Sequence, residues 1–402
     1  MIRFYDSSLG KVETPQGTMT LSKVFFPFFL EMFLMNLMST VNTFTLSFYS
    51  DEAVAAVGAA GQFMGMIVTF YTVISTGASI VISQNIGAKK LKSASDAAFC
   101  ALTASAVLSF IISSILGFAS RPLMSLMNIH GEVLDYASSY FSICIRFSFL
   151  QAITSVSSAI FKSCGRPKIS VSVSLGMNCI NALLNYLVIF RPFEIPLYGV
   201  TGIACSYAIS NACAAVTMLI LLAKVPLGLD FRHKSWQSFR MLRKVLRIGI
   251  PGGISSLSYS ISQVVTTSII ALVGVSAVSA KIYVSNLVFY VYVFGMSLGL
   301  STSLMIGWLT GAVKYEQAYK LNLQNLKIII ILNGTLSLLL FLFGQPLLGI
   351  FTSDPEILAM GHSLLLIDIL VEIFRGFNHI EENSLRGSGD VIFPMAISMT
   401  SC

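Results

Sequence analysis

Long apolar stretches separated by short polar connections recur along almost the whole chain. Most run for about 20 residues or more, the length an α-helix needs to cross the hydrocarbon core of a bilayer. The pattern therefore predicts an all-α polytopic membrane protein. The predicted spans cover residues 24–48, 54–83, 97–119, 136–161, 169–190, 198–223, 248–272, 277–308, 321–343 and 357–385, and an eleventh begins at 391.

Composition supports this class. Of the 402 residues, 55% are hydrophobic and 11% are charged, whereas soluble domains have about 25% charged residues. The seven cysteines are scattered and lack the spacing of metal or disulfide sites. The net charge of +7 comes from the connections between spans. We therefore expect no cofactor and no nucleic-acid partner, and the lipid bilayer is the expected surrounding.

Basic connections alternate with acidic or neutral ones. The connections after the second, fourth and sixth spans carry Lys89, Lys90, Lys92, Lys162, Arg166, Lys168, and seven cations between residues 224 and 247. The other connections carry acids such as Asp51, Glu132 and Glu356. By the positive-inside rule, this predicts a multi-pass protein of the cell membrane with its N-terminus in the cytoplasm. No cleavable signal peptide is evident.

An internal repeat organises the chain. When the sequence is compared with itself at a constant offset of 224, Pro27 meets Pro251, Gly87-Ala88 meets Gly311-Ala312, and Gly165 meets Gly389. Six spans lie in each repeat, and an even number returns the chain to its starting side. The halves should therefore form two six-helix bundles related by a parallel repeat, with an axis along the membrane normal.

The repeat sets the expected domains. Residues 1–223 form the first bundle, 224–247 a basic cytoplasmic linker, and 248–402 the second bundle. Spans at 169–223 predict counterparts near 393–447, which lie beyond the last residue. The sequence is therefore interpreted as C-terminally truncated relative to a twelve-span protein.

One apolar span carries unexpected charges. Asp368, Glu372 and Arg375 are spaced to share one helix face. Each ionisable group at membrane depth costs roughly 2.5–3.5 kcal/mol by insertion scales, so such groups usually mark ion or substrate pathways. Alternatively, Glu372 and Arg375 form a structural ion pair that only packs the spans together. Glu31 lies in another apolar run and is either a switch or an acid hydrogen-bonded to a neighbouring helix.

Polar and aromatic residues within other spans are candidates for a substrate cavity. They could instead join neighbouring helices by hydrogen bonds, or anchor tyrosines at the membrane interface. The aromatic faces would suit organic cations. The candidates are Asn36, Asn42, Asn181 and Asn185 in the first half and Gln263, Tyr283, Asn286 and Tyr290 in the second.

Local patterns resemble the multidrug and toxic compound extrusion (MATE) family, bacterial type. They include QNIGA at Gln84–Ala88, CGRPK at Cys164–Lys168, NALLNYLVIF at Asn181–Phe190, IPGGI at Ile250–Ile254 and SLRGSGDVIFP at Ser384–Pro394. The resemblance implies an exporter that uses inward H⁺ or Na⁺ flow. Asn42 stands at the position of the family's first-span aspartate, and Glu31 resembles a glutamate of a bacterial subgroup. Glu372, Arg375 and Asn378 resemble that subgroup's tenth-span pattern, and Asp368 is an additional acid.

These observations together predict a cation-coupled antiporter that exports small, cationic amphipathic compounds by alternating access. The expected ion-coupling residues are Glu31, Asp368, Glu372, Arg375 and Asn378, and the expected assembly is a monomer. One alternative is a lipid-linked oligosaccharide flippase, although only Arg146, Lys281 and Arg375 could meet its anionic head group. A remote alternative is an intramembrane aspartyl protease, suggested by the GxGD text at residues 387–390. We expect no enzyme, because no other catalytic arrangement appears.

Overall fold

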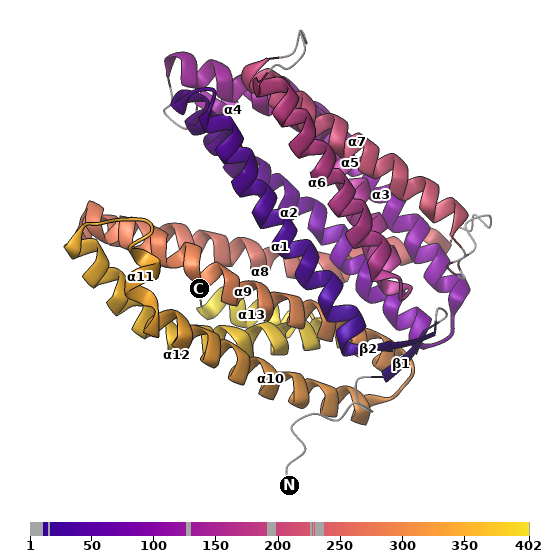
Figure 1. The fold of residues 1–402 in the computed structure, drawn as a ribbon. Coiled ribbons are helices and arrows are strands. Elements are labelled where there is room, and N and C mark those ends of the chain that lie inside the picture. Colours follow the sequence, from indigo (N-terminus) through magenta and orange to yellow (C-terminus); the bar gives the residue numbers. More distant parts are fainter. Residues whose placement is uncertain are drawn as a thin grey trace. The chain divides into compact units, whose positions relative to one another are not determined.

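The computed structural model describes residues 11–14, 17–125, 130–190, 198–225, 227, 229 and 237–401. Each of the eleven predicted spans coincides with a helix, so the all-α membrane class is confirmed (Figure 1). Nine helices within the described ranges are long and apolar enough to cross a membrane. The long helices are α1 (Leu21–Ser47), α2 (Asp51–Gly87), α3 (Leu91–Phe118), α5 (Gly131–Ser163), α6 (Pro167–Phe190), α7 (Gly199–Lys224), α8 (Gln237–Val273), α9 (Val275–Gly311), α10 (Tyr315–Leu342), α12 (Pro355–Ser388) and α13 (Ile392–Ser401).

Short elements that the span pattern did not predict lie between and before these helices. Two short helices, α4 (Ser120–Ser125) and α11 (Gly344–Leu348), follow α3 and α10. A small antiparallel hairpin, β1 (Lys11–Thr14) and β2 (Gly17–Thr20), precedes α1. These elements are too short to give a membrane-length apolar signal. Of the expected linker 224–247, residues 226, 228 and 230–236 lie outside the described residues, and α8 already begins at Gln237.

The helix bounds confirm the repeat. Both ends of α2 are separated from those of α9 by the same offset that aligns the two halves of the sequence, and the same holds for α3 and α10. The connections also match in backbone conformation. Lys89 and Val313 are the equivalent non-glycine residues with positive φ, at 58° and 59°. Gly165 and Gly389 adopt positive φ at equivalent positions after α5 and α12, the conformation that favours glycine at a helix end.

The ends of α2 and α9 make a reciprocal close contact. A Cβ atom on Gly87 would lie 2.0 Å from the carbonyl oxygen of Trp308, and one on Gly311 would lie 2.0 Å from that of Gln84. Trp308 and Gln84 are themselves repeat equivalents. Only glycine permits two helix backbones to approach this closely. The Gln84 side chain adds a hydrogen bond of 2.9 Å to the carbonyl of Gly387 in α12.

The chain forms two compact units. One unit, here called the C-unit, comprises Met1–Phe29, Ser83–Lys89 and Ile254–Cys402, and the other, the N-unit, comprises Leu30–Ile82 and Lys90–Gly253. The boundaries within α1 and α8, after Phe29 and after Gly253, fall at repeat-equivalent positions. The repeat therefore extends to the places where these helices pass from one unit to the other. The domain bounds expected at 223 and 248 stay a prediction.

The interior of each unit has a distinct character. In the N-unit, apolar side chains of α2, α5 and α7 form a continuous buried cluster around Tyr71, Phe141 and Ile145. In the C-unit, α9, α10 and α12 pack directly against one another. Their shared interior contains many polar side chains, whereas α10 exposes Leu338, Leu339 and Leu342 outward. An apolar outside and a polar inside suit a helix that faces lipid, since lipid provides no hydrogen bonds.

Candidate functional site

Glu372 is the most deeply buried acid of the described residues, with no exposed surface. It lies near the middle of α12 and forms an ion pair with Arg375, one turn later on the same helix. The Nδ2 atom of Asn333 in α10 donates to the backbone carbonyl of Glu372 at 3.0 Å and lies 3.5 Å from its Oε2 atom. The carboxylate is thus held by a cation and an amide, in agreement with the requirement that buried charges be paired.

Arg375 is only partly buried. Its side chain keeps 26% of its surface exposed, whereas that of Glu372 keeps none. The ion pair therefore joins the interior of the C-unit to its surface. A cation that reaches the surface can leave the carboxylate more easily than a cation that is fully buried beside it.

Small residues let the helices close around this pair. A Cβ atom on Gly376 would lie 2.8 Å from the Nδ2 atom of Asn333. The imidazole of His379, two turns beyond Glu372, meets the ring of Tyr292 edge to face, with 5.3 Å between ring centroids. The site is therefore built by α9, α10 and α12 together.

The other expected members of the tenth-span site lie differently. Asp368 is one turn before Glu372 and half-buried, and its Oδ2 atom is shielded from solvent without a hydrogen bond from any described group. Asn378 is exposed, on a face of α12 away from the buried Glu372, so the structure does not bring it to the pair. The expectation that Asn378 helps to bind the coupling ion stays a prediction.

Glu31 belongs to a second ion pair, in the N-unit. Its Oε2 atom lies 2.6 Å from the Nζ atom of Lys162, and the side chains keep only 15% and 11% of their surfaces exposed. The sequence pattern placed Lys162 in a basic connection, but it lies within the last turn of α5. The repeat could have indicated that Lys162 is paired, because the residue equivalent to Lys162 is Arg386, which forms an ion pair with Glu382.

Three of the cavity candidates meet in the N-unit. The Nδ2 atom of Asn185 donates to the Oδ1 atom of Asn42 at 2.8 Å and to that of Asn181 at 3.4 Å. This cluster joins α1 to α6 and is uncharged. Asn36 lies on α1 one and a half turns earlier, where its backbone carbonyl accepts from Thr40 at 3.2 Å.

The candidates in the second half are spread over the C-unit. Tyr283 stacks on Phe351 with 5.3 Å between ring centroids, and Asn286 and Tyr290 are exposed. Gln263 is half-buried and accepts, through its backbone carbonyl, a hydrogen bond from Thr267. Thr267 also receives a bond of 2.6 Å from Lys281, which links α8 to α9.

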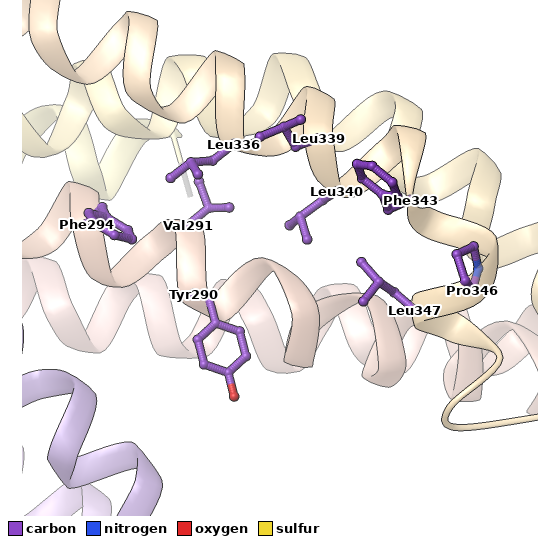
Figure 2. Close-up of a pocket in the computed structure, with 9 residues that line it drawn as sticks. All are labelled: Tyr290, Val291, Phe294, Leu336, Leu339, Leu340, Phe343, Pro346 and Leu347. Atoms are coloured by element: carbon purple, nitrogen blue, oxygen red, sulfur yellow. The ribbon is translucent and has the colours of Figure 1, made fainter.

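An apolar pocket of about 400 Å³ lies between α9, α10 and α11 (Figure 2). Leucines and aromatic rings line it, and the hydroxyl of Tyr290 points away from the leucines of α10. None of the acidic or basic residues discussed above lines this pocket. It is suited to hydrocarbon, not to an ion, and it does not belong to the site of Glu372. Its lining residues are Tyr290, Val291, Phe294, Leu336, Leu339, Leu340, Phe343, Pro346 and Leu347.

The repeat supplies an internal comparison for the charged site. The positions equivalent to Asp368, Glu372 and Arg375 are Cys144, Ser148 and Gln151 in α5. Ser148 is buried and shares a hydrogen bond of 2.8 Å with Tyr71. The same helix arrangement is thus held together in the N-unit by neutral residues. At these equivalent positions the N-unit therefore carries neutral residues where the C-unit carries charges.

Two parallel repeats of membrane-length helices, with a buried acid that pairs with a partly exposed cation, define the class of secondary transporters. The comparisons agree. The family model MatE matches residues 27–187 and 251–402. The chain is 33% identical to the uncharacterized transporter YisQ of Bacillus subtilis over 96% of its own length and 85% of that protein. It is 26% identical to the probable multidrug resistance protein NorM of Thermotoga maritima, over 99% and 86%. The chain belongs to the MatE family.

Solved structures show the same fold. A MOP superfamily transporter from Pyrococcus furiosus matches with a TM-score of 0.85 and 19% identity, over 94% of this chain and 84% of that one. An outward-facing multidrug resistance MATE family transporter matches with a TM-score of 0.86 and 20% identity, over the same shares. The protein is therefore a multi-pass membrane transporter of the multidrug efflux family and not an enzyme.

Proposed function

We propose that the protein is an antiporter that exports small, cationic amphipathic organic compounds by alternating access, driven by H⁺ or Na⁺. Membership of the MatE family supports the transport activity. The NorM relatives are named probable multidrug resistance proteins, which supports the choice of cargo. The protein would act in the cell membrane with its N-terminus in the cytoplasm, as the alternation of basic and acidic connections predicts.

The observation that carries the coupling proposal is the complete burial of Glu372 beside Arg375. Burying two charges is expensive, and a neutral pair of similar volume is often as stable. The equivalent positions in the N-unit hold Ser148 and Gln151 and still build the same helix arrangement. Retention of a costly pair where neutral residues suffice indicates a role in transport.

The proposed mechanism is an exchange of partners at Glu372. In one conformation Arg375 neutralises the carboxylate, and in the other a proton or Na⁺ takes its place. Arginine cannot release its own proton in proteins, so it must move away when the ion binds. Its partly exposed side chain is suited to this movement. Exchange of partners would bias the transporter toward one of its two openings.

Four cations of the described membrane-length helices bear on the choice of cargo. Lys281 is bonded to Thr267, Arg375 is paired with Glu372, and Lys162 with Glu31. Arg146 is exposed on α5. Because three of these four are already engaged, they offer little to a large anionic head group. This favours organic cations, and disfavours a lipid-linked oligosaccharide as cargo.

Transport into everted membrane vesicles tests the proposal. Uptake of a cationic dye is measured with an imposed pH gradient, an imposed Na⁺ gradient, or neither. We expect Glu372→Gln to abolish accumulation against the dye gradient while the protein still folds, because the amide cannot exchange Arg375 for an ion. The matched control is Glu316→Gln, since Glu316 lies on the exposed surface of α10 in an ion pair with Lys320.

Two outcomes would overturn the proposal. The first is uphill uptake by Glu372→Gln at the rate of the control variant. The second is wild-type uptake that depends on neither gradient. If only an anionic lipid-linked sugar, and no cationic dye, is moved, the flippase interpretation replaces the cargo proposed here.

A further inference from the structure

A column of polar side chains extends from Glu372 toward the end of α12. On α10, the buried residues Asn322, Asn325, Asn333 and Ser337 lie three, eight and four residues apart, which places them on one face. Asn333 contacts Glu372, as described above. This set, together with Thr302, His379 and Asn383, is called the polar lane below. Asparagine contributes little apolar surface to a core, so three asparagines along one face of a membrane helix are costly unless their amides have hydrogen-bond partners.

Separate hydrogen bonds fix the side chains at successive levels of the polar lane. Next after Glu372 comes His379, whose backbone carbonyl accepts a bond of 2.9 Å from the Nδ2 atom of Asn383. At the next level the Nδ2 atom of Asn325 donates to Thr302 of α9 at 2.8 Å. Toward the end of α12, Asn322 donates to Glu381 at 3.0 Å. Polar side chains thus recur along α9, α10 and α12 from the level of Glu372 to that of Glu381 and Glu382.

Several buried polar atoms in the polar lane have no hydrogen-bond partner among the described protein groups. The Oδ1 atoms of Asn322, Asn325 and Asn333, the Oγ atom of Ser337 and the Nε2 atom of His379 are buried, and no described protein group bonds to them. Buried polar atoms nearly always have partners, and ordered water supplies them where protein does not. Leftover atoms along one face therefore point to a file of water molecules.

We propose that the polar lane is a water-relayed proton route between Glu372 and the Glu381–Glu382 end of the C-unit, with His379 as an intermediate carrier. The proposal rests on the proposed antiport function and selects the proton as its coupling ion. Histidine can take up a proton on one ring nitrogen and release it from the other. Chains of histidine, acids and water carry protons through other membrane transporters. Each transfer moves one proton from water to the imidazole and one from the imidazole to the next water.

The dimensions of the polar lane favour a proton over a hydrated Na⁺. A Cβ atom on Gly299 would lie 2.8 Å from the carbonyl oxygen of His379 and 2.9 Å from the Nδ2 atom of Asn383. A Cβ atom on Gly295 would lie 3.4 Å from Asn333. Helices packed this closely leave no room for an ion with its hydration shell. With the N-terminus in the cytoplasm, this route would release protons to the cytoplasm.

The equivalent helices of the N-unit lack the amides and the imidazole of the polar lane. The positions equivalent to Asn322, Asn325 and Asn333 are Ala98, Ala101 and Ser109 in α3, and that of His379 is Ser155. Ser109 donates to the carbonyl of Ser105 in its own helix. Within the part of the chain that the structure describes, the polar lane thus lies in the C-unit helices α9, α10 and α12, which also contain Glu372.

The test uses the purified protein in liposomes that contain a pH-sensitive dye. Proton movement is recorded when a cationic substrate is added. We expect Asn325→Leu, which keeps the branched shape but is larger and removes the polar group, to slow proton movement by about tenfold, the rate factor that corresponds to one lost hydrogen bond. Asn325→Ser should restore most of the rate, because it again leaves room for water. His379→Gln should slow the movement similarly. Ile329→Val, on the same buried face, is the packing control.

The outcomes separate the two proposals. Unchanged proton movement in Asn325→Leu and His379→Gln, with Glu372→Gln inactive, would overturn the polar lane and leave the antiport proposal intact. Substrate movement driven by Na⁺ without proton movement would also overturn it. Proton movement that survives Glu372→Gln would instead overturn the antiport proposal. If Asn325→Leu fails to fold, as judged by size-exclusion chromatography, His379→Gln decides the matter by the same criterion.

Discussion

The ammonium group of Lys162 lies 2.6 Å from the carboxylate of Glu31, and both side chains are almost fully buried in the N-unit. In the C-unit the equivalent of Lys162 is Arg386, but its acid partner, Glu382, comes from its own helix. The equivalent of Glu31 is Ser255. Both repeats therefore place a cation in the last turn of a long helix, α5 or α12. The acid that neutralises it comes from α1 in the first case and from α12 itself in the second.

Removal of Lys162 should destabilise the protein strongly. Lys162→Met leaves Glu31 buried without this partner, and breaking a buried ion pair costs about 3–5 kcal/mol. The double variant Glu31→Gln with Lys162→Met should recover most of that loss, since no charge is left buried. Thermal unfolding in detergent provides the measurement. Lys320→Met, which breaks an exposed pair with Glu316, should change stability by about 1 kcal/mol or less. Equal effects of Lys162→Met and Lys320→Met would contradict this account.

Adding a side chain at the reciprocal contact between α2 and α9 should destabilise the protein. Gly87→Ala and Gly311→Ala each place a methyl group within 2.0 Å of a carbonyl oxygen, and such overpacking costs roughly 1–3 kcal/mol. Because the two contacts are repeat equivalents, we expect similar losses. Gly61→Ala is the matched control within α2, where no atom lies within 4 Å of the added Cβ. It should be neutral or stabilising by up to about 1 kcal/mol. The melting temperatures of the three variants decide this, and a neutral Gly311→Ala would refute it.

The asparagine cluster of the N-unit should hold α1 to α6. Asn185→Leu removes the bonds to Asn42 and Asn181. Bonds between membrane helices are worth about 0.6–2 kcal/mol each, so a loss of about 1 kcal/mol in unfolding free energy is expected. Asn378→Leu is the control, because Asn378 is exposed on α12. A substrate-binding role for the cluster would appear separately, as weaker dye binding by Asn185→Leu at unchanged stability.

Asp368 should tune the affinity of the site for its coupling ion. It lies one turn from Glu372 and contributes a second negative charge. Its loss in Asp368→Asn should weaken ion binding by about 2.8 kcal/mol for charges about 6 Å apart at an effective dielectric near 20, or about a hundredfold. Initial rates of export are measured over a range of ion concentrations. The half-saturating concentration should rise while the maximal rate stays close to wild type. Asp135→Asn, in an exposed pair with Arg121, serves as the control, and a lower maximal rate without a change in half-saturation would count against this role.

The repeat shows how far sequence reasoning reaches in this protein. The constant offset between Pro27 and Pro251 predicted equivalent helices, and the bounds of α3 and α10 agree with it at both ends. Membrane-length periodicity is a strong signal because lipid forces each crossing into a complete helix. Asp368, Glu372 and Arg375 were also visible, since charges are rare in apolar spans. Lys162 was not, because a lysine at the end of a span looks the same whether it faces water or pairs with a distant acid.

The sequence by itself determined the class of the protein, its helices, its repeat and the helix that carries the charges. These depend on local periodicity and on the cost of exposing backbone or charge to lipid, which are properties of short segments. Only the tertiary structure decided which acid meets which cation, and that α10 turns its asparagines toward Glu372. Such partners come from segments far apart in the chain, and no pattern within one helix specifies the face of another that it will meet.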